Sequence, residues 1–161
     1  MKIAVVTKNR ASEMKVARRL LRGANMIAIR EEEHDRLMAL ALSLHHLINL
    51  AYAKTLAKYI SPSDFRRLST PNSLLQLTLA EGVLAQNPSL YSYIQIGNEH
   101  SRDVVDTFVQ EIGMINEIIR SKDRKRFEEF FTSASGFYRD DISSHRVLEK
   151  ISKASKLMQD G

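Results

Sequence analysis

The stretch from Arg30 to Ile60, REEEHDRLMALALSLHHLINLAYAKTLAKYI, decides the fold class of this 161-residue chain. It contains neither glycine nor proline, it opens with acids at Glu31 to Glu33, where the helix dipole favours them, and it stops before Pro62. As one helix it would run about 45 Å. Its apolar positions form a stripe broad enough to need burial on more than one side: Leu37, Leu40, Ala41, Leu44, Leu47, Ile48 and Ala51. Such a helix predicts a bundle core or an interface with a partner subunit.

Helix signals also dominate the chain after this stretch. A break at 69–71 separates two helices, and Pro88 can start another at its first turn. Asp123 is a predicted cap for the helix that follows it. The predicted helices cover 62–68, 74–85, 88–97, 100–121, 124–138 and 144–158. No period of 20 to 50 residues repeats, so a solenoid is not expected.

Residues 1–29 have a different character. Ile3 to Thr7 is a β-branched run of the kind that fills a buried strand. A helix is predicted to start at an N-cap on Ser12 and to end at Gly23, and Asn25 to Ile29 reads as a second strand. This is one β-α-β unit, which is too small to be a domain by itself.

Composition and charge exclude several classes of protein. With no cysteine, neither a disulfide-stapled fold nor a Cys-ligated zinc or iron–sulfur site can be built. No apolar run approaches the ~20 residues of a membrane span, and the N-terminus lacks the layout of a signal peptide, so the cytoplasm is the expected location. The net charge is +5, but acids are interleaved with the basic residues except at Lys122 to Arg126. Nucleic-acid binding through that cluster is therefore a minor alternative.

The usual cofactor and metal motifs are missing. The glycines stand at 23, 82, 97, 113, 136 and 161, so neither a G-x-G-x-x-G loop nor a P-loop can place backbone amides against phosphates. His34 and His45 would share a helix face but lie about 16 Å apart along its axis, too far to share a metal. His45 and His46 are splayed by about 100°. We therefore expect no metal site, and no Ser-His-Asp triad can be argued.

Polar residues nevertheless interrupt the leucine-rich helix. His46 and Asn49 are an i, i+3 pair that faces one way, with Ser43 and His45 nearby. They could be core polar groups satisfied by each other or by flanking helices. They could also line a polar pocket for a small ligand. Residue types alone leave both interpretations open.

A series of short motifs runs from residue 33 to residue 127. They are EHDR at 33–36, MA at 38–39, HH at 45–46, AYAKTL at 51–56, LAQNPSLYSYI at 84–94 and SKDRKRF at 121–127. In this order and spacing they resemble the helical C-terminal domain of prephenate dehydrogenases, whose members carry a stretch of the form A-Q-D-P-x-L-Y-x-D-I. The resemblance covers roughly residues 30–150. Residues 1–29 look like the last β-α-β piece of the dinucleotide-binding domain that precedes it in the family.

The resemblance implies a mainly α fold, the multi-helix dimerisation domain of the prephenate dehydrogenase and 6-phosphogluconate dehydrogenase C-terminal-like type, over residues 30–161. Residues 1–29 would be the short β-α-β remnant. Family members oxidise and decarboxylate prephenate to 4-hydroxyphenylpyruvate with NAD or NADP, in tyrosine biosynthesis. Their nucleotide site and catalytic histidine belong to the N-terminal domain, while the helical domain forms an intertwined dimer and supplies substrate contacts. This chain is thus expected to be a fragment or a free-standing relative that forms a homodimer, holds no catalytic or cofactor-binding residue, and is inactive alone.

Two positions bear on the substrate. His46 matches a ligand-contacting histidine of the family, so the resemblance implies that it binds substrate. The family's carboxylate-binding arginine lies nine residues before the aromatic of the second long motif; with Tyr91 as the aromatic, that position is Gly82. No arginine occurs between 67 and 102, so either the ungapped alignment is shifted or another cation, such as Arg66, Arg67 or a residue of the partner subunit, replaces it. The alternative function is a non-catalytic regulatory or interaction module that binds tyrosine or a partner protein.

Overall fold

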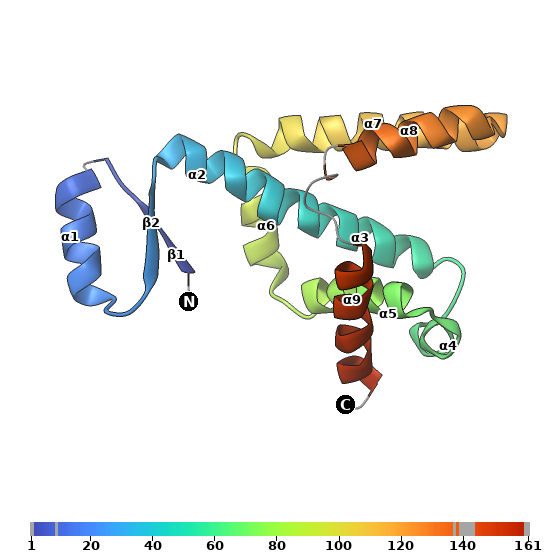
Figure 1. Cartoon of the computed structure of the whole chain (residues 1–161), viewed down its shortest axis with the longest axis horizontal. Helices are drawn as coiled ribbons and strands as arrows, with labels where there is room; N and C mark the ends of the chain where they lie inside the picture. The colour runs from blue at the N-terminus through green and yellow to red at the C-terminus, as the bar shows by residue number, and fades with distance from the viewer. Residues whose placement is uncertain (1, 9, 137, 139–143, 160–161) are drawn as a thin grey trace.

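The stretch that opens at Arg30 is helical as predicted, but it is not one regular helix. The computed structural model describes residues 2–8, 10–136, 138 and 144–159. It divides the stretch into α2 (Glu31–Met38), a π-helix η1 (Ala39–Leu44) and α3 (His45–Leu56), which follow one another along one rod (Figure 1). Acids fill the first turn of α2, as the dipole argument predicted. The rod ends at Leu56 rather than at the predicted Ile60, because 57–59 form turns.

The predicted β-α-β unit is present at the N-terminus. Strands β1 (Lys2–Val6) and β2 (Asn25–Ile29) pair in parallel, with Lys2 opposite Asn25, and α1 (Arg10–Leu20) connects them. Gly23 has a φ of +80°, a left-handed conformation that lets the chain turn from α1 into β2.

The N-cap predicted at Ser12 is wrong. Helix α1 already begins at Arg10, so Ser12 lies inside its first turn. The carboxylate of Glu13 accepts a hydrogen bond of 2.8 Å from the backbone N–H of Lys8, and this contact secures the helix start.

Three successive helices begin at a proline that follows a capping side chain. They are α4 (Pro62–Leu68), α5 (Pro71–Leu84) and α6 (Pro88–Gly97), capped by Ser61, Thr70 and Asn87. Each capping oxygen accepts a backbone N–H of the first turn, which is otherwise unsatisfied. Helix α5 therefore starts before the predicted residue 74, because the supposed break at 69–71 is itself a start signal.

The last helices are α7 (Ser101–Ser121), α8 (Arg124–Gly136) and α9 (Ser144–Gln159). Helices α7 and α8 form a hairpin (Figure 1), and α7 also packs against η1. Lys122 turns the chain with a left-handed φ of 55°, and Asp123 caps α8 by accepting the N–H of Arg126 at 3.0 Å, as predicted. The predicted end of α8 at Tyr138 is two residues late.

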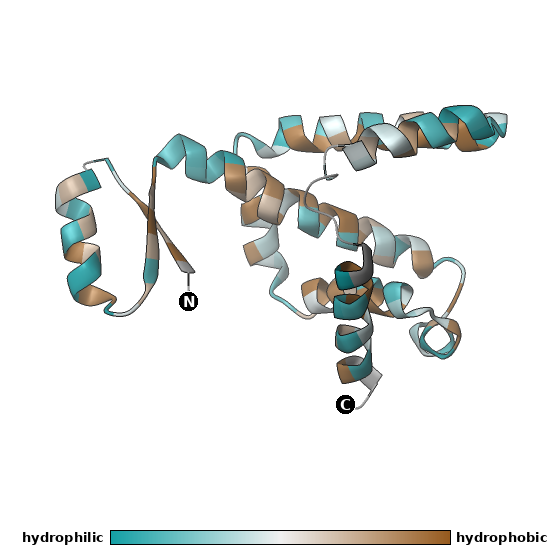
Figure 2. Cartoon of the chain, in the orientation of Figure 1, coloured by the Kyte–Doolittle hydropathy of each residue, from teal (hydrophilic) through white to brown (hydrophobic). Residues whose placement is uncertain are grey.

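The core lies where α3 and α9 pack against α5, and η1 packs against α7. Helix α5 is apolar around much of its circumference, and Leu74, Leu77, Ala80 and Val83 are buried. Figure 2 shows that apolar residues concentrate on η1, α3 and α5, whereas polar residues prevail on α2 and α9. Among the described residues, no helix is both long and apolar enough to cross a membrane.

Candidate functional site

Buried polar side chains follow one face of the rod. Ser43 in η1 is 0% exposed, and His46 and Asn49 in α3 are 5% and 2% exposed. Burial of polar groups at this depth is costly unless they are hydrogen-bonded. Their partners therefore decide which of them are structural and which have binding capacity left.

Asn49 is fully used by the protein. Its side-chain amide donates to the backbone carbonyl of His45 at 2.8 Å, and its Oδ1 accepts from Nε2 of Gln76 in α5 at 2.9 Å. For Asn49 the structural interpretation is confirmed: the side chain joins α3 to α5 and is satisfied in doing so.

His46 is different because it retains an unpaired atom. Its Nδ1 is buried and has no hydrogen-bond partner among the described residues. The imidazole lies against the ring of Tyr91 in α6, with ring centroids 4.2 Å apart and planes inclined by 43°. The ring of His45 is a second neighbour, with its centroid 5.7 Å from that of His46. An unsatisfied buried nitrogen costs about 1 to 3 kcal/mol, which a ligand hydrogen bond would recover.

The surroundings of His46 also set its charge. Burial lowers the pKa of His46 below its usual 6.5, and the nearby His45 lowers it further. The ring is therefore neutral at pH 7, with one nitrogen as a donor and the other as an acceptor. In this form it can hydrogen-bond either a hydroxyl or a carboxylate of a small molecule.

A second unpaired buried nitrogen lies near the same rod. Nε2 of His100, the residue before α7, has no hydrogen-bond partner among the described residues, and the carboxylate of Glu99 lies 3.8 Å from it. The side chain of His100 is 23% exposed, so water can reach part of it. His46 is thus the more deeply buried of the two.

The position of the family arginine is vacant on the surface of α5. Gly82 is exposed, and a Cβ placed on it would meet no atom within 4 Å. The two proposed replacements lie on α4 and are engaged by neighbouring acids. Arg66 hydrogen-bonds the carboxylate of Glu81, and Arg67 contacts Asp64 at 3.4 Å.

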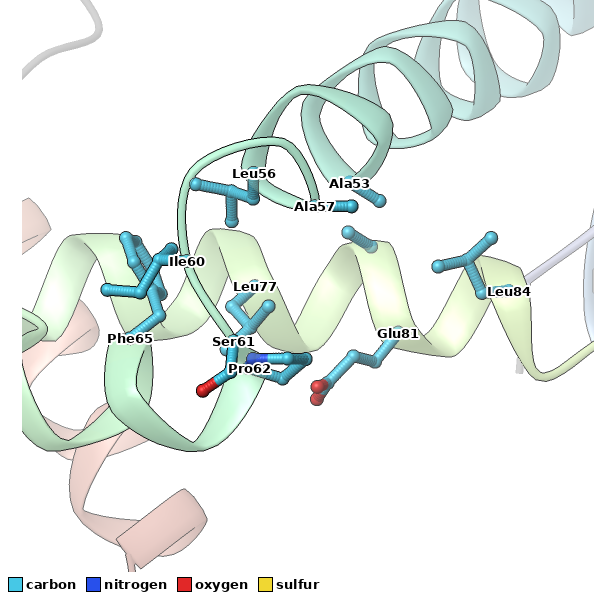
Figure 3. A pocket seen from close by; sticks show the side chains of 11 residues that line it. Ala53, Leu56, Ala57, Ile60, Ser61, Pro62, Phe65, Leu77, Glu81 and Leu84 are labelled. Atoms are coloured by element: carbon cyan, nitrogen blue, oxygen red, sulfur yellow. The ribbon is translucent and has the colours of Figure 1, made fainter.

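An apolar cavity of about 180 Å³ lies between the end of α3, α4 and α5 (Figure 3). Its walls are mostly alanine and larger aliphatic side chains, with Phe65 at one side and Glu81 at the rim. The carboxylate of Glu81 already pairs with Arg66. Ligand sites usually combine an apolar wall with a few convergent polar groups that are free to bind, and His46 does not line this cavity.

The basic cluster at 122–126 is partly neutralised. Lys122 forms the turn between α7 and α8, Lys125 lies 3.7 Å from Glu129, and Arg126 lies 3.2 Å from Glu117. Two of the four basic side chains in this cluster therefore lie next to an acidic group. Within the described part of the chain, no three His, Cys, Asp or Glu side chains gather as metal ligands would.

Sequence reasoning had selected His46 and Asn49 but had missed their partners. The structure brings Tyr91 and Gln76 to them from α6 and α5, and Gln95 and Ser101 to Ser43 from α6 and α7. No local pattern marks these partners, because each lies 27 or more residues away along the chain. Only the long motif at 84–94 had drawn attention to Tyr91.

The structure is a mainly helical domain with buried polar side chains along one face of the rod, preceded by a small parallel sheet. The profile of the family described as "Prephenate dehydrogenase, dimerization domain" matches residues 30–133. The chain therefore belongs to the prephenate dehydrogenase family. The mainly α fold with its small parallel sheet, predicted from the sequence, is confirmed.

Individual relatives agree with this assignment. A probable arogenate/prephenate dehydrogenase of Methanocaldococcus jannaschii is 28% identical over 146 residues, 84% of this chain and 33% of the relative. The T-protein of Enterobacter agglomerans is 27% identical over 119 residues, 73% of this chain and 32% of that protein. The chain thus spans about a third of the length of these relatives.

A solved structure supports the fold. The crystal structure of prephenate dehydrogenase from Aquifex aeolicus superposes with a TM-score of 0.64 at 18% identity, covering 88% of this chain and 50% of that one.

Proposed function

We propose that this chain is the dimerising, substrate-side domain of a prephenate dehydrogenase. In the complete enzyme, a nucleotide-binding domain would supply NAD or NADP and the catalytic histidine for oxidative decarboxylation of prephenate to 4-hydroxyphenylpyruvate. Residues 1–29 would be the end of that domain, and residues 30–161 the helical domain. By itself the chain would bind no nicotinamide cofactor and would not turn over, since its glycines cannot form a phosphate-binding loop.

His46 carries this proposal for the substrate site. It belongs to the segment that matches the family profile, and it is neutral, buried, held against Tyr91 and left with an unpaired Nδ1. A substrate with a ring, a hydroxyl and carboxylates suits this site, because the imidazole offers both a donor and an acceptor beside an apolar ring.

The α7–α8 hairpin supports the homodimer. Its helices are strongly amphipathic, yet several large apolar side chains face solvent: Val109, Ile112, Met114, Ile119, Phe127 and Phe131. Exposed apolar surface of this extent on one element marks a protein interface. The family's description as a dimerization domain makes a second copy of the chain the expected partner.

Calorimetry with the full chain tests the substrate role. We expect 4-hydroxyphenylpyruvate or prephenate to bind, and His46→Gln to weaken binding about tenfold, since it removes one buried hydrogen bond and the contact with Tyr91. His34→Gln is the matched control, because His34 lies on the same rod and is paired with Asp35. If both variants bind like the unmodified chain, His46 is not a substrate contact.

An assay of turnover tests the proposal that catalysis requires a separate nucleotide-binding domain. The chain mixed with prephenate and either NAD⁺ or NADP⁺ should produce no reduced nicotinamide. Measurable turnover would contradict the proposal that the catalytic half is a separate domain.

A second function is favoured by one observation. The position of the substrate-binding arginine is Gly82, and Arg66 is committed to Glu81. A non-catalytic module that binds tyrosine, or only a partner protein, needs no such arginine. Binding of tyrosine without prephenate in the same calorimetric series would favour this second function.

A further inference from the structure

The π-helix sets which residue of the rod faces α6. A π-helical turn contains about one residue more than an α-helical turn, and one residue corresponds to about 100° of rotation. Residues after η1 (Ala39–Leu44) are therefore displaced by about one position from where a regular helix would place them. Without this turn, the place now held by His46 would fall to His45.

Two side chains from outside the rod hold the end of η1. The Ser43 hydroxyl lies 2.6 Å from that of Ser101 in α7, and the Ser43 carbonyl accepts a hydrogen bond of 2.9 Å from Nε2 of Gln95 in α6. Ser43 and Ser101 are 0% and 2% exposed, so water cannot easily replace either partner. Both contacts are made by the same residue, two positions before His45.

Helix α6 connects these contacts to the candidate site. Tyr91 and Gln95 are an i, i+4 pair, so they lie on one face of α6. Tyr91 receives the ring of His46, while Gln95 binds the carbonyl of Ser43. One face of α6 therefore binds the backbone of the rod through Gln95 and contacts the His46 side chain through Tyr91.

We propose that Gln95 and Ser101 are positioning residues for His46: they keep η1 in its π-helical register, and this register places the His46 ring against Tyr91. This proposal deepens the proposed function and rests on it, because the position of His46 matters to the substrate only if His46 binds it. Neither residue needs to touch the ligand. They act through Ser43, whose two polar groups they bind.

The test is the imidazole NMR signal of His46 during a pH titration of the full chain without ligand. Gln95→Met keeps the length of the side chain but removes the donor. We expect the pKa of His46 to move up toward 6.5 as the ring becomes more hydrated, and the ring-current shift from Tyr91 to shrink. Ser101→Ala, which acts from α7, should move both signals in the same direction.

Gln110→Met is the matched control, because Gln110 is exposed on α7. A purely structural role for Gln95 would lower the melting temperature and leave the folded-state signals of His46 unchanged. Unchanged His46 signals in folded Gln95→Met and Ser101→Ala would overturn the proposal.

Repeating the NMR measurement with ligand distinguishes a failure of this proposal from a failure of the proposed function. Adding 4-hydroxyphenylpyruvate should shift the His46 signal of the unmodified chain, and Gln95→Met should weaken that binding roughly fivefold. If His46 of the unmodified chain does not respond to the ligand, the proposed substrate role fails, while the ligand-free titration still decides whether Gln95 and Ser101 position the ring.

Discussion

The crossing of α3 and α5, here called the body, and the α7–α8 hairpin, here called the arm, use the same sequence pattern with opposite results. Both present apolar residues every three or four positions. In the body, Leu77 and Val83 are 5% and 7% exposed, whereas in the arm Ile112 and Phe131 are 48% and 66% exposed. The periodicity predicts a helix that needs a partner. It does not say whether that partner lies in the same chain.

Charged substitutions on the apolar surface of the arm should have the largest effect, and the property affected is dimerisation. We expect the double variant Ile112→Asp and Phe131→Asp to weaken a homodimer at least about 100-fold, because two charges would be buried in an apolar interface. Size-exclusion chromatography with light scattering measures the mass. Leu20→Asp is the control, since Leu20 is 77% exposed on α1 and lies outside the arm. A dimer that survives the double substitution would place the interface elsewhere.

A truncation of a buried side chain in the body should instead lower the stability of the fold. Leu77→Ala should reduce the free energy of unfolding by about 2 to 4 kcal/mol, through lost burial and the cavity that remains. Urea unfolding at one fixed protein concentration measures it. Leu79→Ala on the same helix is the control, because Leu79 is 48% exposed, and it should cost well under half as much. Equal losses would mean that α5 is not packed as described.

The cap at the start of α5, in the body, should contribute a smaller amount of stability. The Thr70 hydroxyl accepts the N–H of Ser73 at 3.3 Å, so Thr70→Ala should reduce the free energy of unfolding by about 1 kcal/mol. Thr70→Asn keeps a capping oxygen and should retain most of the stability. A loss of equal size in both variants would show that the cap does not contribute.

The smallest expected effect concerns pH and His46 in the body. Because the folded pKa lies below the unfolded value of 6.5, the unfolded chain binds more protons between the two values. The stability contributed by neutral His46 is therefore present above pH 6.5 and is lost as the pH falls through 6.5 toward the folded pKa. The unfolding free energy of His46→Gln, measured from pH 7.5 to 5, should fall less steeply than that of the unmodified chain. Parallel curves would mean that burial does not hold the ring neutral.

Most of the fold could be predicted from local chemistry. Asn87 and Pro88, and Asp123, specify helix starts through contacts within one turn, and the first β-branched strand was evident from residue type. Thr70 and Pro71 carry the same signal, although the pattern there was interpreted only as a break. The π-helix was missed because nothing in its residues requires it. Its register depends on Ser101 and Gln95, which lie 58 and 52 residues from Ser43.

The candidate site was predictable only in part. Burial of His46 and Asn49 on one face follows from their spacing, and the structure confirms it. That Asn49 is satisfied while His46 keeps an unpaired nitrogen depends on where Gln76 and Tyr91 arrive from other helices. The substrate role of His46 and the replacement for the arginine at Gly82 remain predictions, because they concern a ligand and a second subunit.

Sedimentation equilibrium of the unmodified chain tests most directly whether the arm's apolar face is covered by a second copy. A homodimer predicts a mass of about twice 18.4 kDa at micromolar concentration. A single species of 18.4 kDa over the whole concentration range would contradict the account.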